Sequence, residues 1–165
     1  MTAQEAFDRY HRQVFGFVCR LTRDRQAAED ITQECFLALV RSPGKFDATR
    51  GTLRAYLCGM ARNLALKRFR DLRVDEPMEG KFAELEDSRG DLDASAAVEQ
   101  AVSRLPVLER EAVILFQYEG LSLAEIAATV GAEVGAVKGR LHRARERLRM
   151  TLAPFRRVGE SNGVE

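Results

Sequence analysis

Apolar residues recur at spacings of three and four along most of this 165-residue chain, and no segment alternates β-branched and polar residues as a strand would. This spacing puts the apolar side chains on one face of a helix. With 45% apolar and 31% charged residues, the chain can bury a core. We therefore expect an all-α protein, with helices over residues 2–21, 24–41, 52–73, 93–104, 106–118, 122–130 and 135–152.

An acidic segment divides these helices into two groups. Residues 75–93 hold eight acidic residues against two basic ones, together with Pro77, Gly80 and Gly90, and show little apolar periodicity. Such a composition is typical of a flexible linker. We therefore predict two small helical domains over residues 1–74 and 93–153, an acidic linker over 75–92, and a tail over 154–165.

Basic residues are concentrated in two segments, although the net charge of the chain is only +1. Residues 50–73 hold seven Lys and Arg against one acid, and residues 135–157 hold eight against one. Two basic patches on either side of an acidic connector suggest a polyanion held at two places. Two solvated helix faces would have the same composition, so charge alone leaves both interpretations open.

The sequence carries no recognisable catalytic, metal-binding or membrane-spanning motif. No apolar run approaches the ~18 residues that span a bilayer, and no signal-peptide core follows Met1. Cys19, Cys35 and Cys58 lie far apart without a CxxC pair, so we expect reduced thiols in the core. No glycine-rich phosphate loop or carboxylate cluster is present. We expect a cytoplasmic protein without enzymatic activity, cofactor, metal or membrane insertion.

A helix-turn-helix is predicted near the C-terminus. Ser122 and Glu125 form a capping box that starts one helix, and Gly131 ends it. The next helix turns one apolar stripe inward, formed by Val137, Leu141, Ala144 and Leu148. Its exposed arc is basic, which favours insertion into the major groove of DNA over a plain solvated face. The arc consists of Lys138, Arg140, His142, Arg143, Arg145, Arg147 and Arg149.

The helix over residues 52–73 carries a mixed polar stripe. Leu53, Leu57, Met60, Ala61 and Leu64 share its apolar face, and the opposite side presents Tyr56, Asn63, Lys67 and Arg70. An aromatic ring, an amide and cations on one line suit DNA whose bases are unstacked. Solvated helices also carry Tyr and Asn, so the stripe alone does not decide between DNA and solvent.

The helix over residues 24–41 has a different outer face. Ile31, Cys35 and Leu39 point inward, whereas the outward row is Asp30, Gln33, Glu34, Leu37 and Arg41. Acidic side chains repel DNA, so this row indicates either a docking face for a protein or a solvated surface.

Two blocks of residues resemble the second and fourth conserved regions of bacterial sigma factors. The first block is residues 28–36 (AEDITQECF), 46–47 (FD), 51–57 (GTLRAYL) and 60–68 (MARNLALKR). The second is residues 105–106 (LP), 109–111 (ERE), 119–122 (EGLS), 125–127 (EIA) and 135–145 (GAVKGRLHRAR). Two such blocks joined only by a linker resemble the extracytoplasmic-function (ECF) group, over residues 5–73 and 93–150.

The resemblance implies a factor that binds core RNA polymerase, reads the minus-thirty-five promoter element and melts the minus-ten element. It also implies an anti-sigma factor as a partner, and a cytoplasmic protein found at the nucleoid when active. Polymerase would be contacted by Asp30, Gln33, Glu34 and Leu37. The minus-ten element would be contacted by Phe46, Tyr56, Asn63, Lys67 and Arg70, and the minus-thirty-five element by Ser122, Lys138, Arg140, His142, Arg143 and Arg145. Within this last set, Arg140 and Arg145 would bind phosphates.

Three positions depart from the family pattern. Tyr56 stands where a Trp is usual, and this chain has no Trp, so the ring available for stacking is smaller. Ala136 and Gly139 stand where Thr and Ser are common, so two hydroxyl contacts to DNA are missing. Gly139 in a helix interior costs ~1 kcal/mol relative to Ala, which indicates either close approach to the duplex or a tolerated weakness.

Two other classes of protein fit the chain less well. A stand-alone helix-turn-helix regulator would leave the Asp30 row and the Tyr56 stripe without a function, and a nucleic-acid enzyme would lack an active site. The apolar residues of the 106–118 helix are expected to pack in the core. The resemblance offers the polymerase flap as an alternative contact for them.

Overall fold

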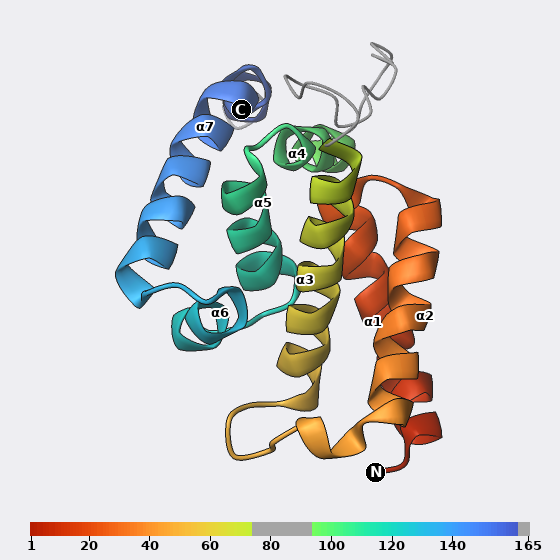
Figure 1. Cartoon of the computed structure of the whole chain (residues 1–165). Helices are drawn as coiled ribbons and strands as arrows, with labels where there is room; N and C mark the ends of the chain where they lie inside the picture. The colour runs from red at the N-terminus through yellow and green to blue at the C-terminus, as the bar shows by residue number, and fades with distance from the viewer. Residues whose placement is uncertain (74–93, 162–165) are drawn as a thin grey trace.

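The computed structural model describes residues 1–73 and 94–161, and every described element is helical (Figure 1). The N-terminal half consists of α1 (Ala3–Thr22), α2 (Arg25–Arg41), the short 3-10 helix η1 (Pro43–Lys45) and α3 (Leu53–Arg73). The C-terminal half consists of α4 (Ala94–Ser103), α5 (Val107–Val113), the π-helical segment η2 (Ile114–Tyr118), α6 (Leu123–Val130) and α7 (Val134–Ser161). The all-α expectation is confirmed, and the linker predicted for residues 75–92 lies outside the described residues.

Caps at the helix ends explain how the N-terminal half turns. Thr2 and Glu5 form a capping box, with hydrogen bonds of 3.1 Å to Thr2 Oγ1 and 2.8 Å to Glu5 Oε2. Helix α1 ends at Arg23, whose φ of 58° is left-handed, and Asp24 then caps α2 by accepting from the amide of Ala27. The tight turn sets α1 beside α2, and α3 packs against both (Figure 1).

The N-terminal helices bury the apolar faces that the periodicity predicted. Fully buried positions include Phe17, Leu21, Ile31, Cys35, Leu57 and Ala61. Leu53, Met60 and Leu64 are half-buried at the edge of the same core. These contacts fix the rotation of α2 and α3, so that their polar stripes face outward.

The C-terminal half contains the predicted helix-turn-helix. Ser122 Oγ accepts from the amide of Glu125 at 3.1 Å, and Glu125 Oε1 accepts from the amide of Ser122 at 3.1 Å. Gly131 ends α6 with a left-handed φ of 67°, a conformation that glycine adopts without strain. Val137, Leu141 and Ala144 of α7 are buried, so the inward stripe of the second helix is confirmed.

Two helix boundaries differ from the sequence-based expectation. The helix expected over residues 106–118 changes at Ile114 from α-helical to π-helical hydrogen bonding. The last helix does not end at residue 152 but continues through Pro154 to Ser161, so the expected tail is helical over residues 154–161. Pro154 is exposed and removes one amide donor from the helix, which nevertheless continues beyond it to Ser161.

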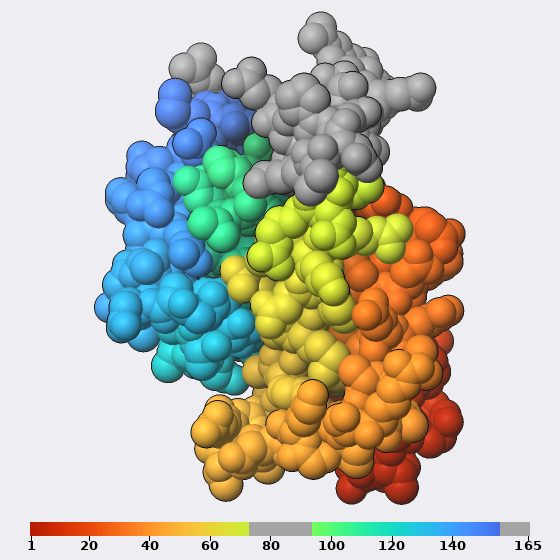
Figure 2. Space-filling view, viewed as in Figure 1, coloured from red at the N-terminus to blue at the C-terminus, as the bar shows by residue number. Residues whose placement is uncertain are grey.

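The two halves lie directly against each other (Figures 1 and 2). Helix α3 packs on α6, and α1 packs on α5 and η2. The α3–α6 approach is close because Gly59 has no side chain: a Cβ there would lie 3.4 Å from Thr129 Cγ2. This packing places the stripe of α3 beside the helix-turn-helix, which the sequence did not indicate.

Candidate nucleic-acid interface

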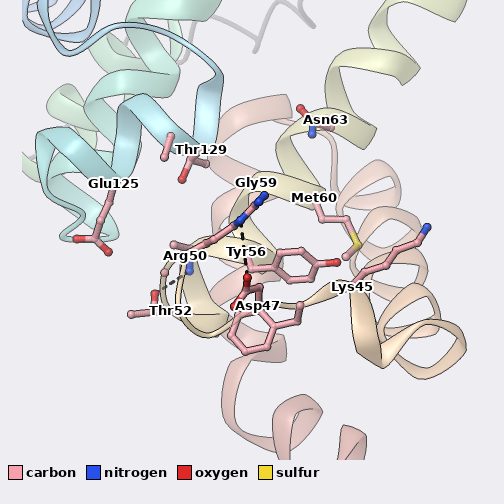
Figure 3. Close-up of a pocket in the computed structure, with 14 residues that line it drawn as sticks. Lys45, Asp47, Arg50, Thr52, Tyr56, Gly59, Met60, Asn63, Glu125 and Thr129 are labelled. Atoms are coloured by element: carbon pink, nitrogen blue, oxygen red, sulfur yellow. Dashed lines mark hydrogen bonds and ion pairs between the residues drawn. The ribbon is translucent and has the colours of Figure 1, made fainter.

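The loop before α3 and the first turns of α3 surround a cavity of about 600 Å³ (Figure 3). Phe46 and Tyr56 line it with their ring centroids 5.3 Å apart and their planes tilted by 55°. Asn63 lines the same cavity two turns further along α3. Two half-buried rings beside an exposed amide form a pocket with the size and chemistry for an unstacked base.

Hydrogen bonds within the loop hold this pocket in shape. Asp47 accepts from the amide of Thr49 at 2.9 Å and from its hydroxyl at 2.6 Å, and these bonds lower the pKa of the Asp47 carboxyl. Thr52 Oγ1 accepts from the amide of Ala55 at 3.1 Å and so starts α3. The loop therefore presents Lys45 and Arg50 at the rim of the pocket (Figure 3).

The remaining two residues of the predicted minus-ten set lie elsewhere on α3. Lys67 and Arg70 are exposed further toward the C-terminal end of the helix, and neither lines the cavity. The structure thus groups Phe46, Tyr56 and Asn63 and leaves the two cations along a separate stretch of surface. Such a stretch is suited to a phosphate backbone that leaves the pocket.

The far wall of the cavity belongs to the C-terminal half. Glu125, Ala128 and Thr129 of α6 complete the lining, and Figure 3 shows Glu125 and Thr129 across the pocket from Tyr56. In Figure 2 the surface is hollowed between the segment around residue 50 and α6. The predicted minus-ten pocket is therefore shared with the first helix of the helix-turn-helix.

The basic arc of α7 lies on the outside of the molecule. Lys138, His142 and Arg145 are exposed, and Arg140 is half-buried. The guanidinium of Arg145 lies 6.0 Å from the centre of the Phe116 ring, and Ser122, which caps α6, is exposed. The whole predicted minus-thirty-five set except Ser122 thus comes from one helix, which is the arrangement that a major groove accepts.

One buried acid beneath this arc was not predicted. Glu109 of α5 is 8% exposed, and its carboxylate lies 3.6 Å from Nε of Arg143 and 3.0 Å from Nε of Arg147. The sequence offered one signal: two arginines four residues apart on a helix that must pack against the segment carrying Glu109.

The outer face of α2 is arranged as predicted. Gln33, Glu34 and Leu37 are exposed, and Asp30 is exposed while it accepts from Arg68 at 3.2 Å and from Gln26 at 3.0 Å. Val40, which was not included in the predicted row, is 59% exposed one turn beyond Leu37. An acidic row that ends in two exposed aliphatic side chains has the composition of a protein-docking surface.

Buried polar contacts join the two halves, and none of them was predicted. Arg62 of α3 donates to Glu111 of α5 from Nε at 2.7 Å and from Nη2 at 3.2 Å. Arg110 donates to the carbonyl oxygen of Leu21 at 2.8 Å, and burial lowers the pKa of its guanidinium to about 10. Arg54 donates to the carbonyl oxygen of Glu119, whose own carboxyl pKa is raised by burial.

The comparisons with known proteins decide the family. Residues 6–74 match Sigma-70 region 2, and residues 95–148 match Sigma-70, region 4. The ECF RNA polymerase sigma factor SigM of Mycobacterium tuberculosis (strain ATCC 25618 / H37Rv) is 32% identical over 148 residues, which cover 87% of this chain and 74% of SigM. The chain belongs to the ECF sigma factors. Its family directs transcription initiation and is not a family of enzymes.

Other relatives agree with this assignment. The ECF RNA polymerase sigma factor SigK of Mycobacterium sp. (strain KMS) is 29% identical to this sigma factor over 144 residues, which cover 82% of this chain and 75% of SigK. The sigma factor RpoE of Bartonella quintana, solved in complex with the anti-sigma factor NepR, has a TM-score of 0.74 at 25% identity, over 91% of this chain and 96% of RpoE. CnrH, solved with the cytosolic domain of CnrY, shares the fold with a TM-score of 0.68 at 24% identity, over 92% of this chain and 88% of CnrH.

Several expectations can now be compared with the structure of this sigma factor. Ala112, Val113, Ile114 and Leu115 are buried, which confirms core packing for most of the 106–118 segment, whereas Leu108 is exposed. Cys35 and Cys58 are buried free thiols, and burial raises the pKa of each to about 12. Cys19 is also a free thiol that packs against the core, but it is only half-buried, so the expectation of core thiols holds in full for Cys35 and Cys58 and in part for Cys19. Within residues 1–73 and 94–161, no helix is both long and apolar enough to cross a membrane.

Proposed function

We propose that this sigma factor reads the minus-thirty-five element with the exposed arc of α7 and captures the minus-ten element at the pocket of Phe46, Tyr56 and Asn63. The observation that carries the proposal is the grouping of Phe46, Tyr56 and Asn63 on the α3 side of the cavity, because two rings and an amide at one place have no role in a plain solvated helix. All three residues belong to the N-terminal half, so the group stays together when α6 moves away. Lys138, His142 and Arg143 reach base edges, while Arg140 and Arg145 neutralise phosphates. Ser122 supports the duplex from the start of α6.

The acidic face of α2 is the proposed docking surface for core polymerase. Asp30, Gln33 and Glu34 would meet the clamp helices of the largest polymerase subunit, with Leu37 and Val40 as the apolar part of the contact. The exposure of all five side chains supports this role. The Asp30–Arg68 ion pair is itself exposed, so a partner cation can replace Arg68 at little cost.

Promoter engagement requires the two halves to separate. The two promoter elements lie about 25 base pairs apart, which is roughly 85 Å of duplex at ~3.4 Å per base pair. In the free protein α3 packs directly on α6, so one molecule in this arrangement cannot occupy both elements. The proposed domains over residues 1–74 and 93–153, joined by the linker over 75–92, would separate between these faces when polymerase binds.

We also propose that an anti-sigma factor binds this protein in the cytoplasm. The support is the likeness to RpoE, which was solved in complex with the anti-sigma factor NepR; the likeness covers 96% of the RpoE chain. A stand-alone helix-turn-helix regulator has no observation in its favour, because both sigma regions are matched.

Transcription in vitro from a promoter library tests the proposal. Core RNA polymerase with the protein should start at specific sites that core enzyme alone does not use, and the selected fragments should share two separated elements. Binding to duplex DNA without any specific start site would contradict the proposal and favour a regulator.

A further inference from the structure

We propose that Glu109 and Gly139 together position the guanidinium of Arg143, and so determine which base pair of the upstream element this sigma factor accepts. The inference rests on the proposed function, in which α7 reads that element. It assigns the two residues that orient the reading arginine: Glu109, which lies beneath α7, and Gly139, which lies within it.

The first holding contact is the buried carboxylate of Glu109. It is 8% exposed on α5, the helix that packs against α7 within the C-terminal half. Its Oε1 lies 3.6 Å from Nε of Arg143, and its Oε2 lies 3.0 Å from Nε of Arg147. One acid thus forms ion pairs with two arginines that are one helical turn apart, although neither contact has the geometry of a hydrogen bond. Because both partners belong to the same half, the contact persists when the halves separate.

The second feature is Gly139, which has no side chain and so leaves space for the guanidinium of Arg143. A Cβ at this position would lie 3.3 Å from Nη1 of Arg143 and 4.0 Å from its Cζ and Nη2. The guanidinium therefore folds back over the preceding turn, as helical side chains do. Glycine destabilises a helix interior relative to alanine, so a packing role for Gly139 accounts for its presence where the family commonly has Ser.

Glu109 and Gly139 orient the guanidinium of Arg143 and still leave it accessible to DNA. Arg143 is 60% exposed, and the contact with Glu109 is made through Nε. The two Nη nitrogens therefore remain as a fork that can donate to the O6 and N7 acceptors of a guanine. An arginine that an ion pair biases toward one orientation discriminates between base pairs better than one that is free to seek any nearby phosphate.

Gly139→Ala separates this role from a structural one. The substitution favours the helix, so the melting temperature should stay equal or rise, while the guanidinium of Arg143 must shift by a few tenths of an ångström and should lose discrimination several-fold at one base pair. The measurement is the affinity of the holoenzyme, made with the full-length protein, for promoter fragments carrying every single change in the upstream element. Gly135→Ala is the matched control, because a Cβ there meets nothing within 4 Å.

Glu109→Gln provides a second test, in which non-specific DNA binding should become tighter while discrimination between base pairs falls. Removing the charge beneath two arginines should tighten non-specific binding several-fold and steepen the salt dependence, while discrimination at the same base pair falls. Simple loss of folding would weaken both kinds of binding. Glu146→Gln is its control, because it removes an exposed acid of α7 that pairs with Arg149 at 2.8 Å.

The outcomes distinguish failure of the positioning role from failure of the proposed function of α7. In an Arg143→Ala background, Gly139→Ala should cause no further loss of discrimination. Unchanged discrimination by the Gly139→Ala holoenzyme at every position would overturn the positioning role and leave the proposed function intact. If the wild-type holoenzyme itself shows no preference in the upstream element, the proposed function fails together with this inference.

Discussion

Arg62 on α3 and Glu111 on α5 form a buried ion pair across the boundary between the two sigma regions. Their side chains are 13% and 1% exposed, and two hydrogen bonds of 2.7 and 3.2 Å join them. Arg62 also donates to Oδ1 of Asn63 at 3.3 Å, so the contact between the halves extends to the proposed minus-ten pocket. The same helix therefore serves the interface between the halves in the free protein and, by our proposal, promoter DNA in the initiation complex.

Arg62→Met should loosen the packing between the halves. It leaves the Glu111 carboxylate buried without a partner, at a cost of about 3–5 kcal/mol, unless the halves separate and let water reach it. Small-angle scattering of the free protein should show a larger radius of gyration, and hydrogen exchange should accelerate in α6. Arg68→Met is the control, because its pair with Asp30 is exposed and worth ~1 kcal/mol or less. An unchanged radius and unchanged exchange would show that the pair does not hold the halves together.

Tyr56→Ala should impair promoter melting more than promoter binding. Stacking of a base on an aromatic ring contributes about 1–3 kcal/mol, so the fraction of open complexes should fall at least several-fold. The measurement is fluorescence of 2-aminopurine placed in the minus-ten element. Tyr56→Phe keeps the ring beside Phe46 and should retain melting, and a promoter that is already mismatched there should rescue the alanine variant. Equal melting by the alanine variant would exclude a stacking role.

Lys138→Ala and Arg145→Ala should have different effects on promoter binding: the first should reduce sequence discrimination, and the second should reduce affinity for all sequences. Lys138 is proposed to read a base edge, so its loss should cost about 1–3 kcal/mol of discrimination at one position of the upstream element. Arg145 is proposed to bind a phosphate, so its loss should weaken binding to all sequences and reduce the salt slope by about 1. Titrations of the holoenzyme at several salt concentrations separate the two effects, and identical behaviour of the variants would contradict the assignment.

Asp30→Ala should weaken assembly with core polymerase by roughly 1–2 kcal/mol, about 5–30-fold, and leave affinity for the upstream element unchanged. Fluorescence anisotropy of the labelled protein with core enzyme measures the first quantity. Asp8→Ala removes the same charge from the exposed side of α1 and should not affect assembly. Normal assembly of the Asp30→Ala protein would contradict the α2 docking surface.

The buried thiols predict a loss of stability at high pH. Burial raises the pKa of Cys35 and Cys58 to about 12, whereas an unfolded thiol ionises near pH ~8.5. The stabilising contribution is thus complete below pH ~8.5 and declines as the pH rises toward about 12, by ~1 kcal/mol per pH unit for each thiol. Urea unfolding between pH 8 and 11 measures the decline, and a Cys35→Ala/Cys58→Ala protein should show a shallower one. Equal slopes would exclude the thiols as its cause.

Periodicity and caps were sufficient to predict the helices and their outward faces. The Ser122 and Glu125 box and the inward turn of Val137 follow from side chains close together in sequence, and the structure confirms them. The helix end expected at residue 152 is wrong, because α7 continues through Pro154 to Ser161, although a proline within a helix loses one hydrogen bond and crowds the carbonyl one turn before it. Cys19 was expected in the core, but it is only half-buried, because it lines a hollow between α1, α4 and η2. Its exposure therefore depends on where α4 and η2 pack.

The sequence by itself determined the all-α class, the basic arc of α7, the acidic face of α2 and the polar stripe of α3, because each depends only on residues within one helix. Tertiary structure alone decided that Arg62 meets Glu111, that Glu109 lies beneath Arg143 and Arg147, and that α6 completes the pocket of Tyr56. These contacts join residues up to tens of positions apart. A charged group that is buried away from water is costly unless an opposite charge lies beside it. The position of that partner is set by how the helices pack and not by the sequence within one helix.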